Sequence, residues 1–185
     1  GLVNLNTAGM PVMAGLFELA ADMEPGEALA LADNVVKWRQ PGGRRGIRGG
    51  QLQAIEDLLQ VDGVTRSLVD AIRDLAVAAE WTVGDVDWSA VPEELLQLLE
   101  RVDPGRVDAV LRRRDNRRQQ QAERAGGFGR RADVAGVVRV DALVQYGDAT
   151  WLRRRWVNLG AAGSSNLPWR VLRIEPPRII HDNRG

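Results

Sequence analysis

Residues 53–75, QAIEDLLQVDGVTRSLVDAIRDL, read as two short amphipathic helices joined by a tight turn. Gly63 is suited to the positive φ that ends the first helix, and Thr65 can accept a hydrogen bond from an amide that opens the second. Hairpins of this kind serve DNA-binding proteins, where glycine amides hold a phosphate, and also serve as packing units. Apolar residues recur at helical spacing at Leu52, Ile55, Leu58 and Leu59 before the turn and at Leu68, Val69, Ile72, Leu75 and Ala76 after it.

Residues 1–39 predict one short strand followed by two helices. The first six residues, GLVNLN, alternate apolar and polar side chains as a strand does. Asn6 or Thr7 is expected to cap a helix that carries Pro11 in its first turn. Pro25 is expected to open the next helix, because its fixed φ suits the first helical position. The apolar positions are Met10, Met13, Leu16, Phe17 and Ala20 in the first helix and Leu31, Val35 and Trp38 in the second.

The segment between these helices and the hairpin is rich in glycine and arginine. Residues 40–50, QPGGRRGIRGG, contain five glycines and one proline, a composition that cannot continue a helix. The segment is therefore a predicted loop. Its arginines Arg44, Arg45 and Arg48 are expected to be solvated; the alternative is that they bind an acidic partner.

Residues 86–118 partly repeat the beginning of the chain. The sequence VDWS at 86–89 parallels VNLN at 3–6, and an acidic-Pro-Gly corner occurs once in each copy, at Pro25 and at Pro104. This order predicts two degenerate copies of one helical unit, at about residues 3–80 and 86–118. The apolar positions of the second copy are Leu95, Leu98 and Leu99 in its first helix and Val107, Val110 and Leu111 in the next.

A dense basic run follows at residues 112–131. It is expected to be the exposed end of a helix that frays into a polar linker at residues 126–136, because cations are favoured near a helix C-terminus. Nucleic acid and an acidic protein are the alternative partners, although no aromatic platform surrounds the run. The predicted all-α domain thus covers residues 7–125. The arginines of the run are Arg112, Arg113, Arg114, Arg117, Arg118, Arg124, Arg130 and Arg131.

The C-terminal part alternates with period two and predicts an antiparallel meander over residues 137–176. Its strands begin with Val138, Val140, Ala142 and Val144, turn at Tyr146-Gly147-Asp148, and continue at residues 150–158 and 169–175. Residues 1–6 are expected to add a first strand, and residues 177–185, with a solvated His181, to form a tail. One apolar face of this sheet must be covered. The tryptophans Trp151, Trp156 and Trp169 are expected to pack in the sheet, and any exposed one would suit a partner interface.

Composition limits the chemistry of this chain. Twenty-five basic and 25 acidic residues give no net charge and so no global attraction to anionic partners. Without cysteine and with one histidine, disulfides and the usual zinc sites are excluded. No phosphate-binding loop, histidine pair or nucleophile elbow is found, so no enzyme activity is expected. No apolar run approaches the roughly 20 residues that span a bilayer; the start at Gly1 leads us to expect a membrane segment upstream.

Five stretches in order resemble the periplasmic part of the K-class minor pseudopilins of the type II secretion system, the general secretion pathway protein K family. The resemblance covers nearly the whole chain. The residues in these stretches that are expected to hold the structure are Val3, Asn4, Asn6, Thr7, Trp38, Gly63 and Thr65. The stretches are VNLNTA at 3–8, ADNVVKWRQPGG at 32–43, IEDLLQVDGVTRSLVDAI at 55–72, VDWSAVPEELLQLL at 86–99 and VVRVDALVQYG at 137–147.

The resemblance implies an α+β fold, with a small antiparallel pilin-like sheet interrupted after its first strand by a large all-α domain of helix-hairpin-helix or SAM-like repeats. It implies a non-enzymatic subunit that caps the pseudopilus tip and helps to initiate assembly with minor pseudopilins of the I and J classes. The H class, the major pseudopilin and secreted substrates are further implied partners. An N-terminal helix would anchor the protein in the bacterial inner membrane, with this part in the periplasm.

The resemblance also bears on calcium. Some members bind calcium in an acidic, cysteine-bearing part of the helical domain. This chain has no cysteine and carries arginines in its glycine-rich loop, so no metal ligand is assigned and no cofactor is expected.

The alternative is a helix-hairpin-helix DNA-binding protein of the competence type, which shares the VNLNTA opening and the hairpins that follow. Its turn normally reads Gly-apolar-Gly, and the second glycine lets a phosphate approach the backbone amides. Here the turn is Gly63-Val64-Thr65, so Thr65 removes that approach. Because the net charge is also zero, nucleic acid is not expected among the partners.

Overall fold

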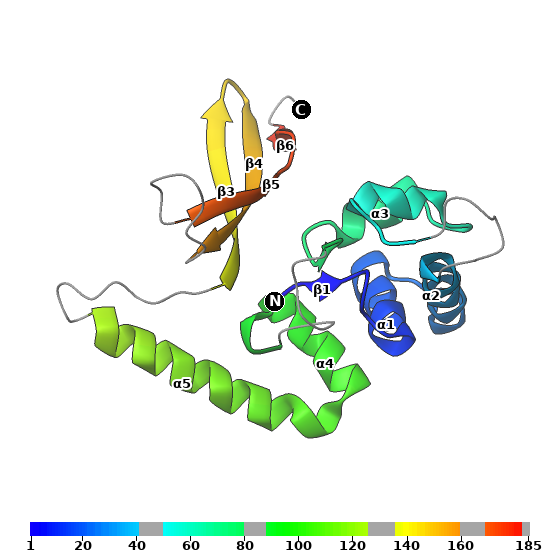
Figure 1. The fold of residues 1–185 in the computed structure, drawn as a ribbon, viewed down its shortest axis with the longest axis horizontal. Helices are drawn as coiled ribbons and strands as arrows, with labels where there is room; N and C mark the ends of the chain where they lie inside the picture. The colour runs from blue at the N-terminus through cyan, green and yellow to red at the C-terminus, as the bar shows by residue number, and fades with distance from the viewer. Residues whose placement is uncertain (41–49, 80–87, 126–135, 160–168, 183–185) are drawn as a thin grey trace. The chain divides into compact units, whose positions relative to one another are not determined.

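The computed structural model describes residues 1–40, 50–79, 88–125, 136–159 and 169–182 (Figure 1). The chain divides into two compact units, Gly1–Gly126 and Gly127–Gly185. The first unit is mostly helical and the second contains a sheet, so the predicted α+β class is confirmed at this level. We describe each unit by itself.

The helical unit, in the residues described, contains helices α1 to α5, which Figure 1 labels, together with two short strands and four short 3-10 helices. Pro25 and Pro104 open α2 and η4, as the two acidic-Pro-Gly corners predicted. The elements are β1 (Val3–Asn4), α1 (Met10–Ala21), α2 (Pro25–Arg39), η1 (Ile55–Gln60), α3 (Arg66–Ile72), β2 (Ala76–Val77), η2 (Trp88–Ala90), η3 (Glu93–Leu95), α4 (Leu96–Val102), η4 (Pro104–Arg106) and α5 (Val107–Ala125).

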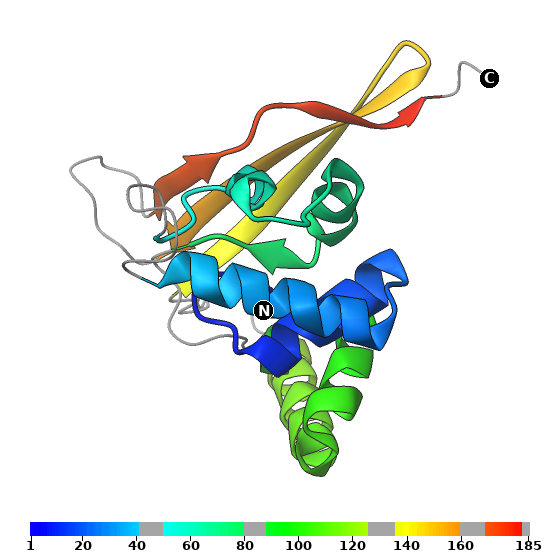
Figure 2. The same cartoon turned by 90° about the vertical axis from the view of Figure 1, so that its right-hand side faces the viewer.

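Helix α1 is at the centre of the helical unit and packs against α2, α3 and α4. Figure 2 shows α1 and α2 as adjacent blue helices, with the green helices below them. Met13, Leu16 and Phe17 are fully buried on α1, as the helical spacing predicted. Gly15 faces Leu98 of α4 so closely that an added Cβ would lie 2.4 Å from Leu98 Cδ1, so this glycine permits the close approach of the two helices.

Most residues of the predicted stripes lie in this core, but Met10, Leu59 and Leu111 do not, because they are 39%, 37% and 40% exposed. Leu31, Val35, Leu95, Leu98 and Leu99 are buried, and Trp38 is half-buried. The prediction was therefore wrong for Met10, Leu59 and Leu111. The covered side of α5 runs instead through Val107, Val110 and Arg114.

The hairpin at residues 53–75 has a tighter first arm than predicted, because η1 is a 3-10 helix. Both predictions for its turn are confirmed: Gly63 has a φ of 90°, and Thr65 Oγ1 accepts a 3.2 Å hydrogen bond from the Leu68 amide. Arg73 donates to Glu56 at 2.6 Å and so ties the end of the second arm to the first arm.

The first strand does not join the C-terminal sheet in this structure. β1 pairs in parallel with β2, with Val3 opposite Ala76 and Asn4 opposite Val77. Both strands lie in the helical unit. The predicted all-α domain at residues 7–125 therefore contains a strand, β2. Residues 1–6 do not form the predicted first strand of the C-terminal sheet. The physical reason is local: β2 directly follows the hairpin, and the Val3 amide donates to the Leu75 carbonyl at 3.0 Å.

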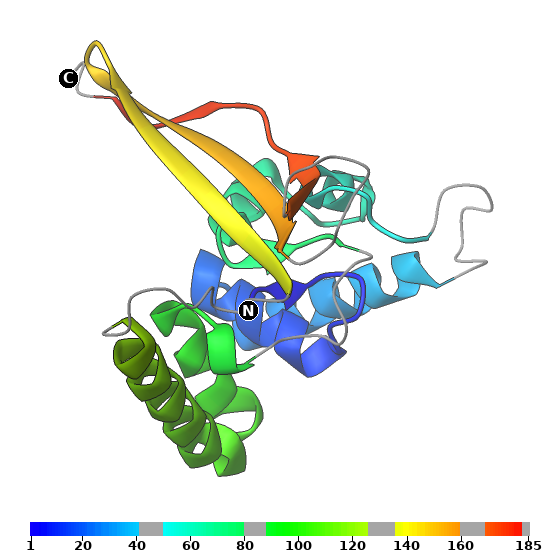
Figure 3. The same cartoon turned by 60° about the vertical axis from the view of Figure 1, so that its left-hand side comes forward.

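The second unit is one antiparallel sheet built on β4 (Ala149–Leu159). β3 (Gly136–Tyr146) leads into β4 through the predicted turn at Gly147, whose φ is 59°, and pairs with β4 along its whole length. The opposite side of β4 is shared by β5 (Trp169–Ile174) and β6 (Arg178–Asp182). Figure 3 shows β3 in yellow on one side of β4 and the red strands on the other.

The predicted tail is partly a strand, because β6 falls within residues 177–185. Pro176 and Pro177 were expected to end the sheet, since proline cannot donate to a strand ladder. They instead interrupt one edge, and β6 continues beyond them in the direction of β5 (Figure 2). His181 is exposed as expected, but it lies in β6 opposite Thr150.

Candidate functional site

The asparagines of the VNLNTA stretch act as structural clamps inside the helical unit. Asn4 is 1% exposed and donates from Nδ2 to the Ala79 carbonyl at 3.1 Å. The Asn6 side chain donates to the Leu52 carbonyl at 2.9 Å and accepts from the Leu52 amide at 2.8 Å. Because the Asn6 side chain is used in this way, it does not cap α1. The N-cap position is Gly9, so the predicted cap at Asn6 or Thr7 was wrong.

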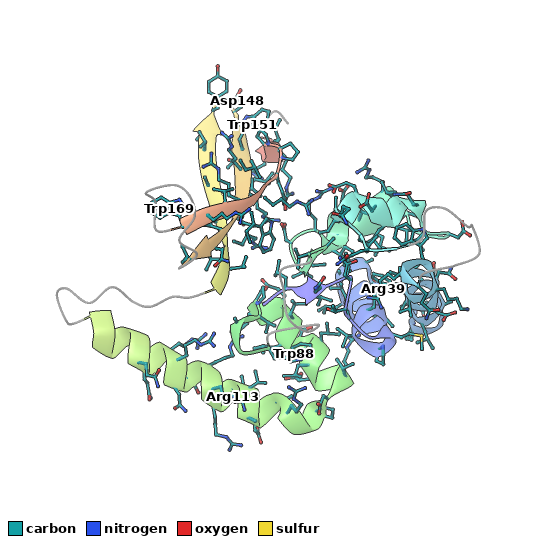
Figure 4. The ribbon with its side chains drawn as sticks, in the orientation of Figure 1. Arg39, Trp88, Arg113, Asp148, Trp151 and Trp169 are labelled. Carbon is teal, nitrogen blue, oxygen red and sulfur yellow. The ribbon has the colours of Figure 1, made fainter. Side chains whose placement is uncertain are left out.

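Arg39 holds the same stretch from α2, a role that the sequence did not reveal. Its guanidinium donates to the Leu5 carbonyl at 2.6 Å and to the Ala8 carbonyl at 2.9 Å. Burial lowers the pKa of Arg39, and an arginine remains charged at neutral pH even so. Arg39 is labelled in Figure 4. These contacts give VNLNTA a physical role in joining β1 to α2 and to residue 52.

The turn of the hairpin is packed against α2. An added Cβ on Gly63 would lie 3.1 Å from Leu31 Cδ1, and Asn34 donates to the Asp62 carbonyl at 3.1 Å. A residue with a side chain at position 63 would therefore meet both an unfavourable φ and a close neighbour. These contacts support a packing role for Gly63.

A part-buried ion pair, with a buried arginine and a more accessible aspartate, joins two strands of the C-terminal sheet. Arg154 of β4 is 3% exposed, and its Nε and Nη2 lie 2.8 and 2.9 Å from the two carboxylate oxygens of Asp141 on β3. Glu175 lies 4.0 Å from Arg154 Nη1 and accepts a 3.1 Å hydrogen bond from Trp156 Nε1. This bidentate geometry is the strong form of an ion pair. Sequence reasoning missed it, because Arg154 stands between two other arginines in a strand.

The opposite face of the sheet carries many exposed apolar side chains, which surround two exposed arginines of β4, Arg153 and Arg155. Residues directly opposite each other in a ladder point to the same side, so the register places alternate residues of β3, β4, β5 and β6 on one face. We call this the apolar face. Large side chains on it that are at least 40% exposed are Val140, Val144, Tyr146, Trp169, Val171, Ile174 and Ile179.

The three sheet tryptophans separate between the two faces. Trp151 pairs with Val144 and Trp169 pairs with Leu159, so both belong to the apolar face; Trp169 is 41% exposed and Trp151 is half-buried (Figure 4). Trp156 lies on the ion-pair face, is 7% exposed and bonds to Glu175. Trp156 therefore has the contacts of a packing residue, whereas Trp151 and Trp169 lie where a partner can reach.

The basic run lies largely on the outside of α5. Arg112, Arg113, Arg117 and Arg118 are exposed, and Figure 4 shows Arg113 pointing away from the helix. Arg114 is turned inward and donates to the Val91 carbonyl at 2.7 Å. Through this bond Arg114 fastens the first half of α5 to the segment that follows the 3-10 helix at Trp88.

Part of the predicted loops and of the second copy lies outside the described residues. This applies to the arginines of the glycine-rich loop, to the start of the second copy and to the linker with the end of the basic run. The positions are Arg44, Arg45, Arg48, Val86, Asp87, Arg130, Arg131 and most of 126–136.

Three further kinds of site could exist among the described residues: a surface depression, a metal-ligand cluster and a membrane-spanning helix. An open depression of about 520 Å³ between α1, α2 and α4 is lined mainly by apolar side chains, with the 3.0 Å ion pair of Arg101 and Glu18 beside them. Within the described ranges, no three side chains of the metal-binding kinds gather as a metal site. Among those same residues, no helix has both the length and the apolar character needed to cross a bilayer.

The apolar face is therefore the strongest candidate for a functional site, because seven large apolar side chains are at least 40% exposed on it. Comparison of the sequence with protein-family models gives no match, and comparison with curated proteins gives none either.

Proposed function

We propose that this protein is a non-enzymatic minor pseudopilin of the K class, which caps the pseudopilus tip of a type II secretion system and helps to initiate its assembly. In this proposal the sheet unit is the pilin-like part and the helical unit is the inserted domain of helix-hairpin-helix or SAM-like repeats. The protein works at the bacterial inner membrane and in the periplasm. Its partners are the I- and J-class minor pseudopilins, with H-class and major pseudopilins and secreted substrates beyond them.

The observation that carries the proposal is the apolar face of the sheet. A sheet with one apolar face needs a second layer, and a helix is a common one. Val144 and Ile174, on β3 and β5, are 55% and 53% exposed on this face. In the proposed pseudopilin, an apolar helix that precedes residue 1 in the full-length protein lies on this face and continues into the membrane.

The packing of the hairpin also favours this role over DNA binding. The turn at Gly63 contacts Leu31, and Thr65 uses its side chain to cap α3. A phosphate-binding hairpin needs free backbone amides at the turn. A structural hairpin inside an inserted domain needs the packing that is observed.

The first test is assembly with the proposed partners. The purified chain is mixed with the periplasmic parts of I- and J-class minor pseudopilins from the same genome at tens of micromolar and analysed by size exclusion. We expect one peak that contains all three chains and elutes before each chain alone. Separate elution of the three chains contradicts the proposal.

The second test concerns the helix on the apolar face. Hydrogen exchange of β3 and β5 is compared between the full-length protein in detergent and this chain. We expect slower exchange around Val140 and Ile174 in the full-length protein, with no change around Leu29, which is exposed on α2 and serves as the internal control. Equal exchange in the two proteins contradicts the covering helix.

A further inference from the structure

Strand β3 lies at the edge of the sheet in the described residues, with β4 on one side of it. It is 11 residues long, well above the usual strand length of about 5–6 residues. Val140, Leu143 and Val144 are 47%, 63% and 55% exposed along it. A long exposed edge is a template for pairing with another strand.

The sequence of β3 is complementary to itself in the antiparallel direction. Taking Val140 as the centre of VVRVDAL at residues 137–143, Arg139 falls opposite Asp141. Valine and alanine fall opposite each other at 138 and 142, and valine and leucine do so at 137 and 143. Opposite charges and apolar pairs directly across an antiparallel ladder are each favourable.

The two nearest registers that keep matching faces together are centred on Arg139 and on Asp141 instead of Val140, and both are disfavoured. One shift places Arg139 opposite Arg139 of the second strand, and the other places Asp141 opposite Asp141, and like charges directly across a ladder are destabilising. An odd shift pairs the two faces wrongly, because successive side chains point to opposite sides. The charges on this edge therefore select one register while opposing its neighbours.

We propose that β3 pairs antiparallel with β3 of a second copy of this chain, about a twofold axis at Val140. Arg139 already lies 3.2 Å from Asp141 of its own strand, and Asp141 also holds Arg154. In the pair, each Arg139 lies opposite the Asp141 of the other copy, and the apolar faces of the two sheets become continuous. This is an isologous contact, so it closes at two copies. The inference does not rest on the proposed secretion role.

Cysteine cross-linking tests the register, because the chain has no cysteine of its own. In the pair the two residues at position 140 are directly opposite, with Cβ atoms about 4.5–5.5 Å apart. The two residues at position 144 are about 27 Å apart along the strands. With a short bis-maleimide, V140C is expected to give cross-linked dimer and V144C to give none.

A mixture gives a second check of the register. V138C and A142C are each about 14 Å from their own copies across the axis but lie opposite each other. The mixture is expected to cross-link, whereas each variant alone is not. Cross-linking of V144C as strongly as V140C, or no gain in the mixture, overturns the proposed register.

Sedimentation of the unmodified chain tests the association itself. The average mass is expected to rise towards twice the chain mass of 20.3 kDa as concentration increases. Arg139→Glu places two acids opposite each other and is expected to remove the dimer. Arg153→Glu is the matched control, because Arg153 is an exposed arginine of β4 away from the edge. A constant monomer mass, or equal loss in the control, overturns the proposal. Co-elution with pseudopilins is a separate readout and does not decide it.

Discussion

The helical unit and the sheet unit differ in how they bury their apolar residues. In the helical unit Phe17, Leu58 and Leu98 are fully buried, and α1 is covered by α2, α3 and α4. In the sheet unit Val144 and Ile174 are more than half exposed, although they stand in regular strands. One unit closes its core within the described residues, and the other presents an open apolar layer.

This difference separates residues that serve stability from residues that serve recognition. A buried leucine in the helical unit contributes roughly 1.5–3 kcal/mol by leaving water. An exposed valine on the apolar face gains little of this energy until another surface covers it. We therefore expect changes in the helical core to reduce stability, and changes on the apolar face to reduce association.

The largest expected effect is on the closed core. Leu58→Asp places an unpaired charge at a fully buried position of η1 and is expected to destabilise the helical unit by more than about 4 kcal/mol, enough to unfold it. Leu59→Asp is the matched control, because the neighbouring Leu59 is 37% exposed. Helical circular dichroism and thermal denaturation measure both variants. Equal loss in the two would show that the core is not closed at Leu58.

The next largest effect is expected in the sheet. Asp141→Asn leaves the buried Arg154 without its bidentate carboxylate and is expected to destabilise the sheet by about 3 kcal/mol. Asp148→Asn changes an exposed aspartate of the adjacent turn and controls for the loss of one charge. Hydrogen exchange read separately over the two units measures the effect. Faster exchange in β3 and β4 alone would sharpen the comparison, whereas faster exchange in α1 as well would break it.

A smaller effect is expected where the asparagine clamps the start of the chain. Asn6→Ala removes both hydrogen bonds to residue 52 and is expected to cost about 1–3 kcal/mol of unfolding free energy. Asn34→Ala removes one exposed bond to the Asp62 carbonyl and should cost less. Urea denaturation compares them. A larger cost for Asn34→Ala would contradict the clamp.

Within the apolar face, substitutions at buried and at exposed β-branched residues should change the free energy of unfolding by different amounts. Val157→Thr buries a hydroxyl at a position that is 8% exposed and is expected to cost about 1–2 kcal/mol. Ile174→Thr changes a side chain that is 53% exposed and should stay within about 0.5 kcal/mol. Denaturation gives the stabilities, and size exclusion with the proposed partners gives the association. A substantial stability cost at Ile174 would mean that the face is already covered.

The smallest effect is expected at the hairpin turn. Thr65→Gly replaces one acceptable N-cap with another and should cost only a few tenths of a kcal/mol. It also restores the Gly-apolar-Gly turn of DNA-binding hairpins. Fluorescence anisotropy with duplex DNA at rising salt is expected to show no binding for either protein. Salt-dependent binding by the original chain would favour the DNA-binding alternative.

The sequence predicted most helices and strands because their apolar periods were clear. The stripes of Leu16 and Leu98 and the alternation at Val140 and Val144 all correspond to elements of the structure. Gly63 and Thr65 followed local rules of turn and cap geometry, so they could be predicted without knowing the rest of the fold.

Contacts between distant parts of the chain could not be predicted in the same way. The pairing of β1 with β2 involves two residues on each strand, too few to leave a periodic signal. Asn6 has the chemistry of a helix cap, and only the position of residue 52 shows that its side chain is engaged elsewhere. For the apolar face, the alternation predicted which side chains share a side, but not the bidentate Arg154 and Asp141 pair on the other side.

The two prolines between β5 and β6 limit how many strands the sheet can recruit. Neither Pro176 nor Pro177 has an amide hydrogen, and the edge is irregular at this point, so a straight strand cannot bond along it without a gap. β3 is the continuous edge of the described sheet. A subunit that can pair through one sheet edge alone forms a dimer and does not add further copies. The prolines thus favour discrete particles over fibres, even though the sheet carries a long strand and an exposed apolar layer.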